Sequence, residues 1–241
     1  MTDVANIWSY LAQGPLLWLT LTLVAYGLGD WAFRASGRKP VVNPVLLAVA
    51  LLAVLLRLTQ TSYETYFAGA QFVHFMLGPA TVALAVPLFA NLSHIRASAL
   101  PMLAALLAGS LTAMTSAVVI ARSLGVDHAT LLALLPKSAT APVALGVSEA
   151  IGGSPTLTAV LVITTGITGA IIATPLFNAL GITDYRARGF ALGTASHGIG
   201  TARAFQVNET AGAFAGIGMG LNALLTALLA PLLAPLLIGA Y

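Results

Sequence analysis

The 241-residue chain contains no cysteine and very little charge. The missing thiols exclude disulfides, thiol catalysis and metal sites built on cysteine. Charged residues make up 7% of the chain, whereas a soluble domain carries about 25%. Ten basic and seven acidic side chains cannot coat a water-facing surface of this size, and 59% of the residues are hydrophobic. We therefore expect a protein whose main solvent is the lipid bilayer.

The few charges do not gather into a functional patch. The net charge of +3 is small and scattered, so no nucleic-acid partner is expected. No two acids have a spacing that suits a metal, and no nucleophile and base occur together, so we predict neither a metal site nor an enzyme. The first residues lack a basic segment before their apolar run, which argues against a cleaved signal peptide.

Long apolar runs fill most of the chain. A spanning helix needs about 20 mostly apolar residues, and about eight segments meet or approach this length. The linkers are too short for a soluble domain. We therefore predict an all-α polytopic membrane protein with about seven or eight transmembrane segments, forming a single integral membrane domain over residues 1–241. The segments are 15–33, 41–59, 71–91, 100–121, 130–150, 155–179, 187–206 and 211–238.

Three of these segments are too polar or too rich in proline and glycine to face lipid, namely 71–91, 130–150 and 187–206. Irregular backbone at membrane depth must line a cavity or pack inside the bundle, so we predict broken or re-entrant helices here. If 130–150 enters and leaves on one side, the lysines and arginines divide more unevenly between the two sides, as the positive-inside rule requires.

Two short runs resemble each other, 79-PATVALAV-86 and 138-SATAPVAL-145. Transporters often contain two related halves, each with a broken helix, so the similarity is consistent with inverted repeats. The alternative is a chance similarity between two alanine-rich stretches.

Lys137 is the most informative single residue. It lies in an apolar run between Pro136 and Pro142 and is followed by Ser138 and Thr140, so the helix around it is predicted to be interrupted. A lysine at membrane depth costs several kcal/mol and marks a functional site by default. The alternative is a lysine near a helix end whose ammonium reaches the lipid head groups.

A second polar cluster lies in 193-GTASHGIGTARAF-205. Its hydroxyls, its imidazole and the backbone N–H groups freed by glycines suit a small oxygen-rich anion. The alternative is a glycine-packed helix whose histidine bonds a neighbour. The candidates here are Thr194, Ser196, His197, Gly198, Thr201 and Arg203.

Further polar residues are weaker candidates. Gln71 and His74 share a helix face before a Gly-Pro break, where they form either a second polar wall or a satisfied core pair. Asn222 follows glycines spaced four apart, a pattern typical of closely packed membrane helices, so we predict that Asn222 forms an interhelical hydrogen bond.

Three ordered motifs resemble the LrgB/CidB (YohK-like) family of bacterial membrane proteins over about residues 40–235. They are 77-LGPATVALAVPLF-89, 135-LPKSATAPVALGVSEAIGG-153 and 189-GFALGTASHGIGTARAF-205, the last followed by 212-GAFAGIGMGLNALLTALLAPLL-233. The family was first described as antiholin- or holin-like, with effects on murein hydrolase activity and autolysis. It also includes the C-terminal half of the plant chloroplast glycolate/glycerate transporter.

The resemblance implies a multi-pass protein of the bacterial cytoplasmic (inner) membrane that can have a small LrgA/CidA-type membrane partner. We also expect a homo-oligomer, with a homodimer as the expected state. It also implies a fold with two crossed broken helices. It adds Pro79 and Thr81, from the Gly-Pro-Ala-Thr break, to the candidate site residues, beside Lys137, Ser138 and Thr140.

Together these observations predict a secondary transporter of small monocarboxylates such as glycolate, glycerate, pyruvate or lactate. Lys137 would balance the charge of the carboxylate, and His197 would carry a proton, because imidazole titrates near neutral pH. No cofactor is expected; coupling to a proton or to sodium is left open. The alternative is an antiholin-like component that regulates murein hydrolase activity and autolysis.

Overall fold

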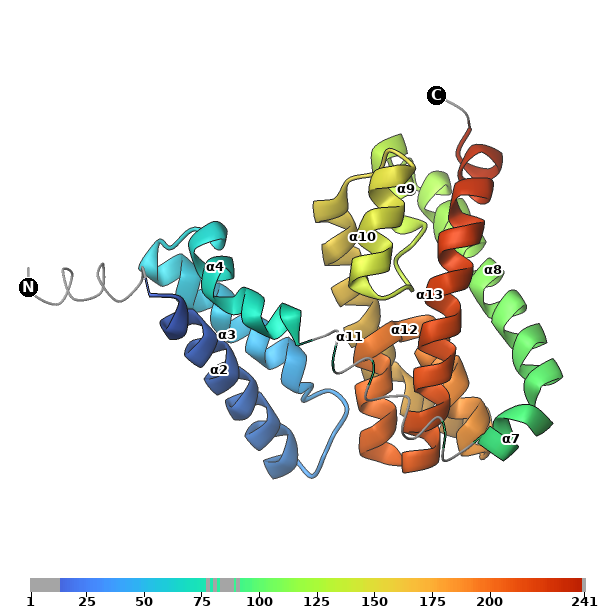
Figure 1. The fold of residues 1–241 in the computed structure, drawn as a ribbon, viewed down its shortest axis with the longest axis horizontal. Helices are drawn as coiled ribbons and strands as arrows, with labels where there is room; N and C mark the ends of the chain where they lie inside the picture. The colour runs from blue at the N-terminus through green and yellow to red at the C-terminus, as the bar shows by residue number, and fades with distance from the viewer. Residues whose placement is uncertain (1–13, 77–78, 80–81, 83–88, 90–91, 240–241) are drawn as a thin grey trace, which may run out of the picture. The chain divides into compact units, whose positions relative to one another are not determined.

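The computed structural model describes residues 14–76, 79, 82, 89 and 92–239, and every regular element in these stretches is a helix. The predicted all-α class is therefore confirmed. Contacts divide the chain into two compact units, Met1–Ala85 and Val86–Tyr241, which are described separately below (Figure 1). The single membrane domain over residues 1–241 stays a prediction.

The first unit contains α2 (Pro15–Ala35), α3 (Pro44–Thr59) and α4 (Tyr63–Phe75). Proline occupies the first turn of α2 and of α3, where its missing N–H costs nothing. Asn43 caps α3, since its side-chain oxygen accepts from the N–H groups of Val45 at 2.9 Å and Leu46 at 3.1 Å.

The second unit contains the remaining helices. They are α7 (Leu92–Ala97), α8 (Ala99–Ser123), α9 (His128–Leu134), α10 (Ala141–Ala150), α11 (Pro155–Ala179), α12 (Tyr185–Val207) and α13 (Glu209–Leu237). Among the described residues, α2, α8, α11 and α13 are long and apolar enough to cross a membrane, and α3 is a shorter apolar helix. The predicted count of seven or eight spans is not confirmed, because two predicted spans in the second unit fold back on themselves.

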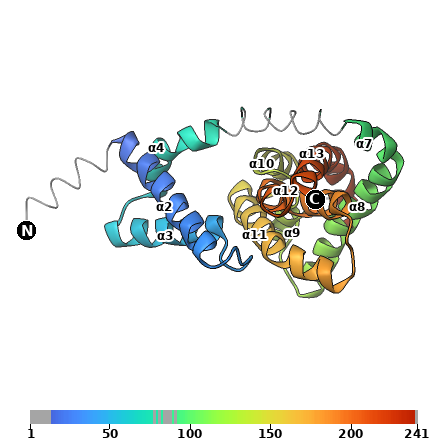
Figure 2. The same ribbon diagram turned by 90° about the horizontal axis from the view of Figure 1, so that it is seen from below.

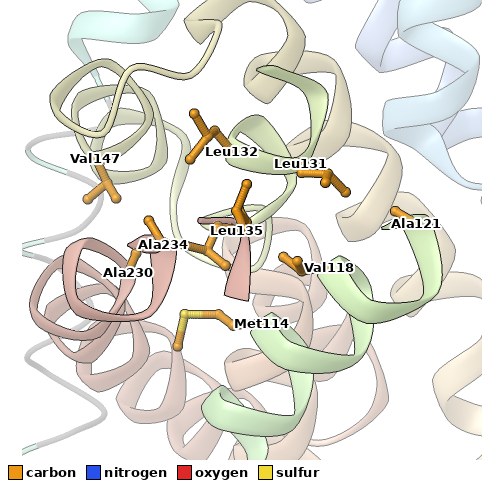
Figure 3. Close-up of a cluster of buried hydrophobic side chains, with 10 residues drawn as sticks. Met114, Val118, Ala121, Leu131, Leu132, Leu135, Val147, Ala230 and Ala234 are labelled. Atoms are coloured by element: carbon orange, nitrogen blue, oxygen red, sulfur yellow. The ribbon is translucent and has the colours of Figure 1, made fainter. Parts of the chain in front are cut away.

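The first of these is a re-entrant hairpin formed by α9 and α10. Leu131 and Leu132 of α9 and Val147 of α10 pack in one apolar cluster with Ala230 and Ala234, near the C-terminal end of α13 (Figure 3). The chain therefore enters and leaves this hairpin at the same end of α13. The residues between the arms, 135–140, form the first hairpin tip.

The second hairpin lies within α12, whose helix is interrupted at Ser196 and His197. A Cβ added to Gly200 would lie 2.8 Å from the carbonyl oxygen of Leu192. In a continuous helix, residues eight apart are about 12 Å apart along the axis, so the chain must reverse direction between them. Leu192 and Ala204, on opposite arms, also belong to one buried cluster. Ser196 and His197 form the second hairpin tip.

The second hairpin is held against α13 by glycines. A side chain on Gly189 or Gly193 would collide with the backbone of Ala211 or Ala215, and one on Gly218 would lie 2.5 Å from the carbonyl oxygen of Phe190. These contacts advance in the same direction on both helices, so the first arm of α12 runs parallel to the N-terminal half of α13. Seen along the bundle, α12 lies at the centre of the unit (Figure 2).

The two hairpins enter from opposite ends of the bundle. The α9–α10 hairpin lies beside the C-terminal half of α13, and α12 lies beside its N-terminal half (Figure 1). Each hairpin is followed by a long helix, α11 or α13, that starts at the base of that hairpin and runs through the bundle. Residues 128–179 and 185–237 thus form two units of inverted topology, which is a common transporter architecture.

The predicted similarity between 79–86 and 138–145 stays a prediction, because most of the first run lies outside the described residues. The observed units are offset by more than fifty residues in a different register (α9 starts at residue 128 and α12 at residue 185).

Candidate functional site at the hairpin tips

The first tip brings Lys137 to the interior of the bundle. It follows the end of α9 and precedes Ala141, the first residue of α10, so the predicted interruption between Pro136 and Pro142 is present. Thr140 is the N-cap residue of α10, but its side chain makes no capping hydrogen bond. The first N–H groups of α10, at the positive end of the helix dipole, are therefore not satisfied by Thr140.

Lys137 is partly buried and has no acidic partner among the described residues, whose ion pairs join only Arg34 to Asp30 and Arg186 to Asp184. Its ammonium donates to the hydroxyl of Ser138 over 3.4 Å, which is a long contact for a charged donor. A hydroxyl carries no charge, so this contact does not neutralise an ammonium. The site therefore holds a cation whose counter-ion is missing from the described protein groups.

The second tip is fixed by close backbone packing. His197 has φ +40° and ψ −135°, a backbone conformation that residues other than glycine rarely adopt. Two glycines of α11 admit the tip: a Cβ on Gly166 would lie 2.6 Å from the His197 ring, and one on Gly169 would overlap the Ser196 hydroxyl. These two glycines therefore let α11 approach the second tip closely.

The protonation pattern of the His197 ring follows from its partner. Nε2 lies 2.9 Å from the carbonyl oxygen of Val162, which can only accept a hydrogen bond. Nε2 must therefore carry the proton in the neutral ring, and Nδ1 is the nitrogen that can take up another. The hydroxyl of Thr201 donates to the carbonyl of His197 at 2.8 Å and so stabilises the reversal of the chain.

The two tips meet at Val162, near the middle of α11. Its side chain packs in a buried cluster with Ala139 of the first tip, while its carbonyl oxygen binds His197 of the second. The structure thus brings the two predicted polar segments, around Lys137 and around His197, to the same residue of α11.

Asn222 lies beside the first tip, where it donates to the carbonyl oxygen of Ser138 at 3.1 Å and accepts from the hydroxyl of Ser110. Its predicted interhelical hydrogen bond is confirmed. Asn222 is 1% exposed, and both the nitrogen and the oxygen of its amide are hydrogen-bonded. It therefore supports the backbone of the tip.

The other candidates of α12 surround the second tip in different ways. Thr194 is buried, and its hydroxyl has no hydrogen-bond partner among the described residues. Gly198 is exposed and starts the return arm of the hairpin. Arg203 is buried further along this arm, where Nη1 donates to Gln206 over 3.4 Å.

The remaining candidates belong to the first unit. Gln71 is exposed on α4 and donates to the carbonyl of Ala68. His74 belongs to α4, but its side chain lies outside the described part of the chain. Pro79 is helical and exposed, whereas Thr81 lies outside the described residues.

A cavity of about 600 Å³ leads toward the second tip between α8 and the first arm of α12. Small residues line it on both sides, including Ala105 and Gly109 of α8 and Ala191 and Ala195 of α12. Its inner end reaches Thr194 and Ala195, next to the interruption at Ser196. Its outer end carries Ser98, Asp184 and Arg186.

The charges at the outer end are paired. Asp184 caps α12 by accepting from the N–H of Arg186 at 2.8 Å, and its carboxylate binds the Arg186 guanidinium at 2.7 Å. The Arg186 side chain, followed by this backbone hydrogen bond, holds the pKa of the Asp184 carboxyl below its usual value. This exposed pair therefore lies at the outer end of the cavity.

Sequence reasoning missed three contributors to the site. Ser110 is a single hydroxyl in the apolar helix α8, and its pairing with Asn222 depends on contacts 112 positions apart. Val162 contributes through its backbone carbonyl, which no side-chain pattern can reveal. Met219 lies 3.8 Å from the hydroxyl of Thr201 and reads in the sequence as an ordinary apolar residue.

Comparison with known proteins identifies the family. The model of the LrgB-like family matches residues 22–236. Protein YxaC of Bacillus subtilis (strain 168) is 37% identical over 180 residues, which cover 75% of this chain and 78% of YxaC. The antiholin-like protein LrgB of Bacillus mycoides (strain KBAB4) is 30% identical over 203 residues, covering 84% of this chain and 88% of that protein.

An antiholin-like protein LrgB of Bacillus cereus (strain B4264) is similar to the same extent, at 30% identity over 203 residues. No solved structure matches the chain significantly. The family match covers most of the described helices, including both hairpins and the helices that follow them. The protein is a membrane protein that belongs to the LrgB-like family.

Proposed function

We propose that the protein is a secondary transporter of small monocarboxylates such as glycolate, glycerate, pyruvate or lactate. The observation that carries the proposal is the position of Lys137, a partly buried ammonium without an acidic partner among the described residues, on a hairpin tip that meets a second tip inside the bundle. An unneutralised cation at membrane depth is costly, and a transported anion would neutralise it.

The surroundings of Lys137 suit a single carboxylate. One ammonium balances one negative charge, and the uncapped first turn of α10 adds N–H donors at the positive end of the helix dipole. The hydroxyls of Ser138 and Thr140 lie on the same tip and would bind the 2-hydroxyl or keto oxygen of the acid. The second tip contributes Ser196 and His197, while Thr201 supports its backbone.

We propose proton coupling through His197. Its Nε2–H is committed to the Val162 carbonyl, so Nδ1 is the atom that gains and loses the transported proton. A carboxylate bound between the tips would bring a negative charge close to this ring and so favour protonation of His197. Substrate and proton would then bind together, as symport requires.

The mostly apolar cavity between α8 and α12 supports this function as an approach to the second tip. It extends from the surface pair Asp184 and Arg186 to Ala195, beside the second tip. The inverted arrangement of the two hairpins would provide an equivalent path from the other end in a second state. Both belong to the proposal of a carrier in the bacterial cytoplasmic membrane, for which we also propose a homodimeric state.

A second candidate function comes from the relatives. The Bacillus mycoides and Bacillus cereus relatives are named antiholin-like, which favours a component that controls autolysis. A small LrgA/CidA-type membrane partner belongs to this second proposal. The two candidates require different assemblies. A holin-type hole needs a large oligomer with polar surfaces facing the pore, whereas a carrier needs an enclosed polar site within each subunit.

Uptake of labelled pyruvate and glycolate into proteoliposomes tests the proposal. A carrier gives saturable uptake that unlabelled carboxylates inhibit and that protein-free liposomes lack. A hole-forming component gives leakage of any small solute, without saturation. Absence of saturable uptake of both pyruvate and glycolate, together with altered autolysis in cells lacking the protein, would favour the antiholin-like function instead.

A further inference from the structure

A chain of buried hydrogen bonds connects the apolar helix α8 to the first hairpin tip. Ser110 on α8 donates its hydroxyl to Oδ1 of Asn222 on α13, 2.5 Å away. Nδ2 of Asn222 donates in turn to the backbone carbonyl of Ser138 at 3.1 Å. Ser110 and Asn222 are only 2% and 1% exposed, so water does not compete for these bonds.

Only one orientation of the Asn222 amide satisfies both partners. The Ser138 carbonyl can only accept, so the amide nitrogen must face it and the amide oxygen must face Ser110. The Ser110 hydroxyl is then obliged to donate. A rotated amide would place two acceptors against each other in the interior, where an unmade hydrogen bond is costly.

The carbonyl that Asn222 holds belongs to the residue next to Lys137. The ammonium of Lys137 in turn donates to the Ser138 hydroxyl, so the chain of contacts runs from Ser110 to the charged group itself. The tip lies between two short helices, α9 and α10, and outside the ladder of either one. A bond from outside the hairpin therefore restricts how the Ser138 peptide can turn.

We infer that Ser110 and Asn222 are positioning residues, which hold the Ser138 peptide so that Lys137 presents its ammonium to the carboxylate. The inference rests on the proposed transport function. It also gives α8 a part in the site: a shift of α8 relative to α13 would break the bond to Asn222 and change the geometry of the tip.

The first test measures uptake kinetics. Asn222→Leu keeps the approximate size of the side chain and removes both bonds, so we expect the KM for the carboxylate to rise by about tenfold, the effect of losing a buried hydrogen bond, with a smaller change in maximal rate. Ser110→Ala should raise KM less, and Ser110→Thr, which keeps a hydroxyl, should restore it. Thr115→Val is the matched control, because that hydroxyl bonds only to Leu111 of its own helix.

The second test does not depend on transport. The natural chain has no cysteine, so a Lys137→Cys variant carries a single thiol at the tip. We expect Asn222→Leu, added to this variant, to change the rate at which a small methanethiosulfonate reagent modifies the thiol several-fold, and Thr115→Val to leave the rate unchanged. Ser110→Ala serves in both tests if Asn222→Leu does not fold.

The outcomes separate the inference from the proposed function. A wild-type KM and an unchanged thiol reaction rate in Asn222→Leu and Ser110→Ala would overturn the positioning role while leaving transport intact. Failure of the proposed function would appear differently, as wild-type uptake by Lys137→Ala or as no saturable uptake by the natural protein. The thiol reaction still decides the positioning role in that case.

Discussion

At the scale of single residues, the backbone conformation of His197 decides where its imidazole lies. His197 lies at φ +40°, so its imidazole is held in place by a backbone conformation that favours glycine. Its ring is fixed by the Val162 carbonyl and its own carbonyl by Thr201. A substitution that keeps the backbone conformation of residue 197 and removes the imidazole can therefore test the role of the ring alone.

His197→Gly provides that separation. Glycine adopts the positive φ without strain, so we expect the variant to remain folded, while loss of the imidazole removes the proposed proton carrier. Uptake should lose its dependence on an inward proton gradient, measured in proteoliposomes at several external pH values. Equal stimulation by the gradient in the variant and the natural protein would exclude His197 as the proton carrier.

At the scale of elements, glycines decide how closely the helices approach. Gly193 lies against the backbone of Ala215, where no side-chain movement can make room for a methyl group. Gly220, on α13, faces open space. The two positions look equivalent in the sequence but are different in the fold.

We expect Gly193→Ala to lower the free energy of unfolding by about 1–3 kcal/mol, the usual cost of overpacking, because α12 and α13 must separate. Gly220→Ala is the control and should not lower it, since alanine favours a helix more than glycine does. Thermal unfolding in detergent measures both. Equal melting temperatures for the two variants would contradict the close packing of α12 on α13.

The elements were predictable from sequence to different degrees. Apolar length identified the long helices, and Pro136 and Pro142 indicated the break around Lys137. The reversal at His197 has no proline to mark it; glycines and hydroxyls indicated an irregular segment, but only the approach of Gly200 to Leu192 reveals a hairpin. Such a contact depends on the packing of the whole bundle, so local sequence patterns do not determine it.

At the scale of the molecule, the second unit has an uneven distribution of charge between its two ends. Arg96, Arg186 and Arg188 lie at the end where α8 and α12 begin, whereas Arg122 lies at the other end and donates to the carbonyl of Leu237. The positive-inside rule then places the first end in the cytoplasm and the C-terminal end of α13 outside.

Cysteine labelling in intact cells tests this orientation against a cysteine-free background. A membrane-impermeant maleimide should label a Gly239→Cys variant, because this residue follows α13 at the predicted outer end. It should not label Thr183→Cys, in the loop between α11 and α12, until the cells are opened. The reverse pattern would show that the protein has the opposite orientation.

The central claim for the whole molecule is that Lys137 binds a transported carboxylate between the two hairpin tips. Uptake of labelled pyruvate or glycolate by proteoliposomes containing Lys137→Ala tests it, with Lys39→Ala, an exposed lysine of the first unit, as the matched control. Loss of a charge-assisted contact should reduce uptake by Lys137→Ala at least about tenfold while the protein remains folded, and Lys39→Ala should transport normally. Uptake by Lys137→Ala at the natural rate would contradict the claim.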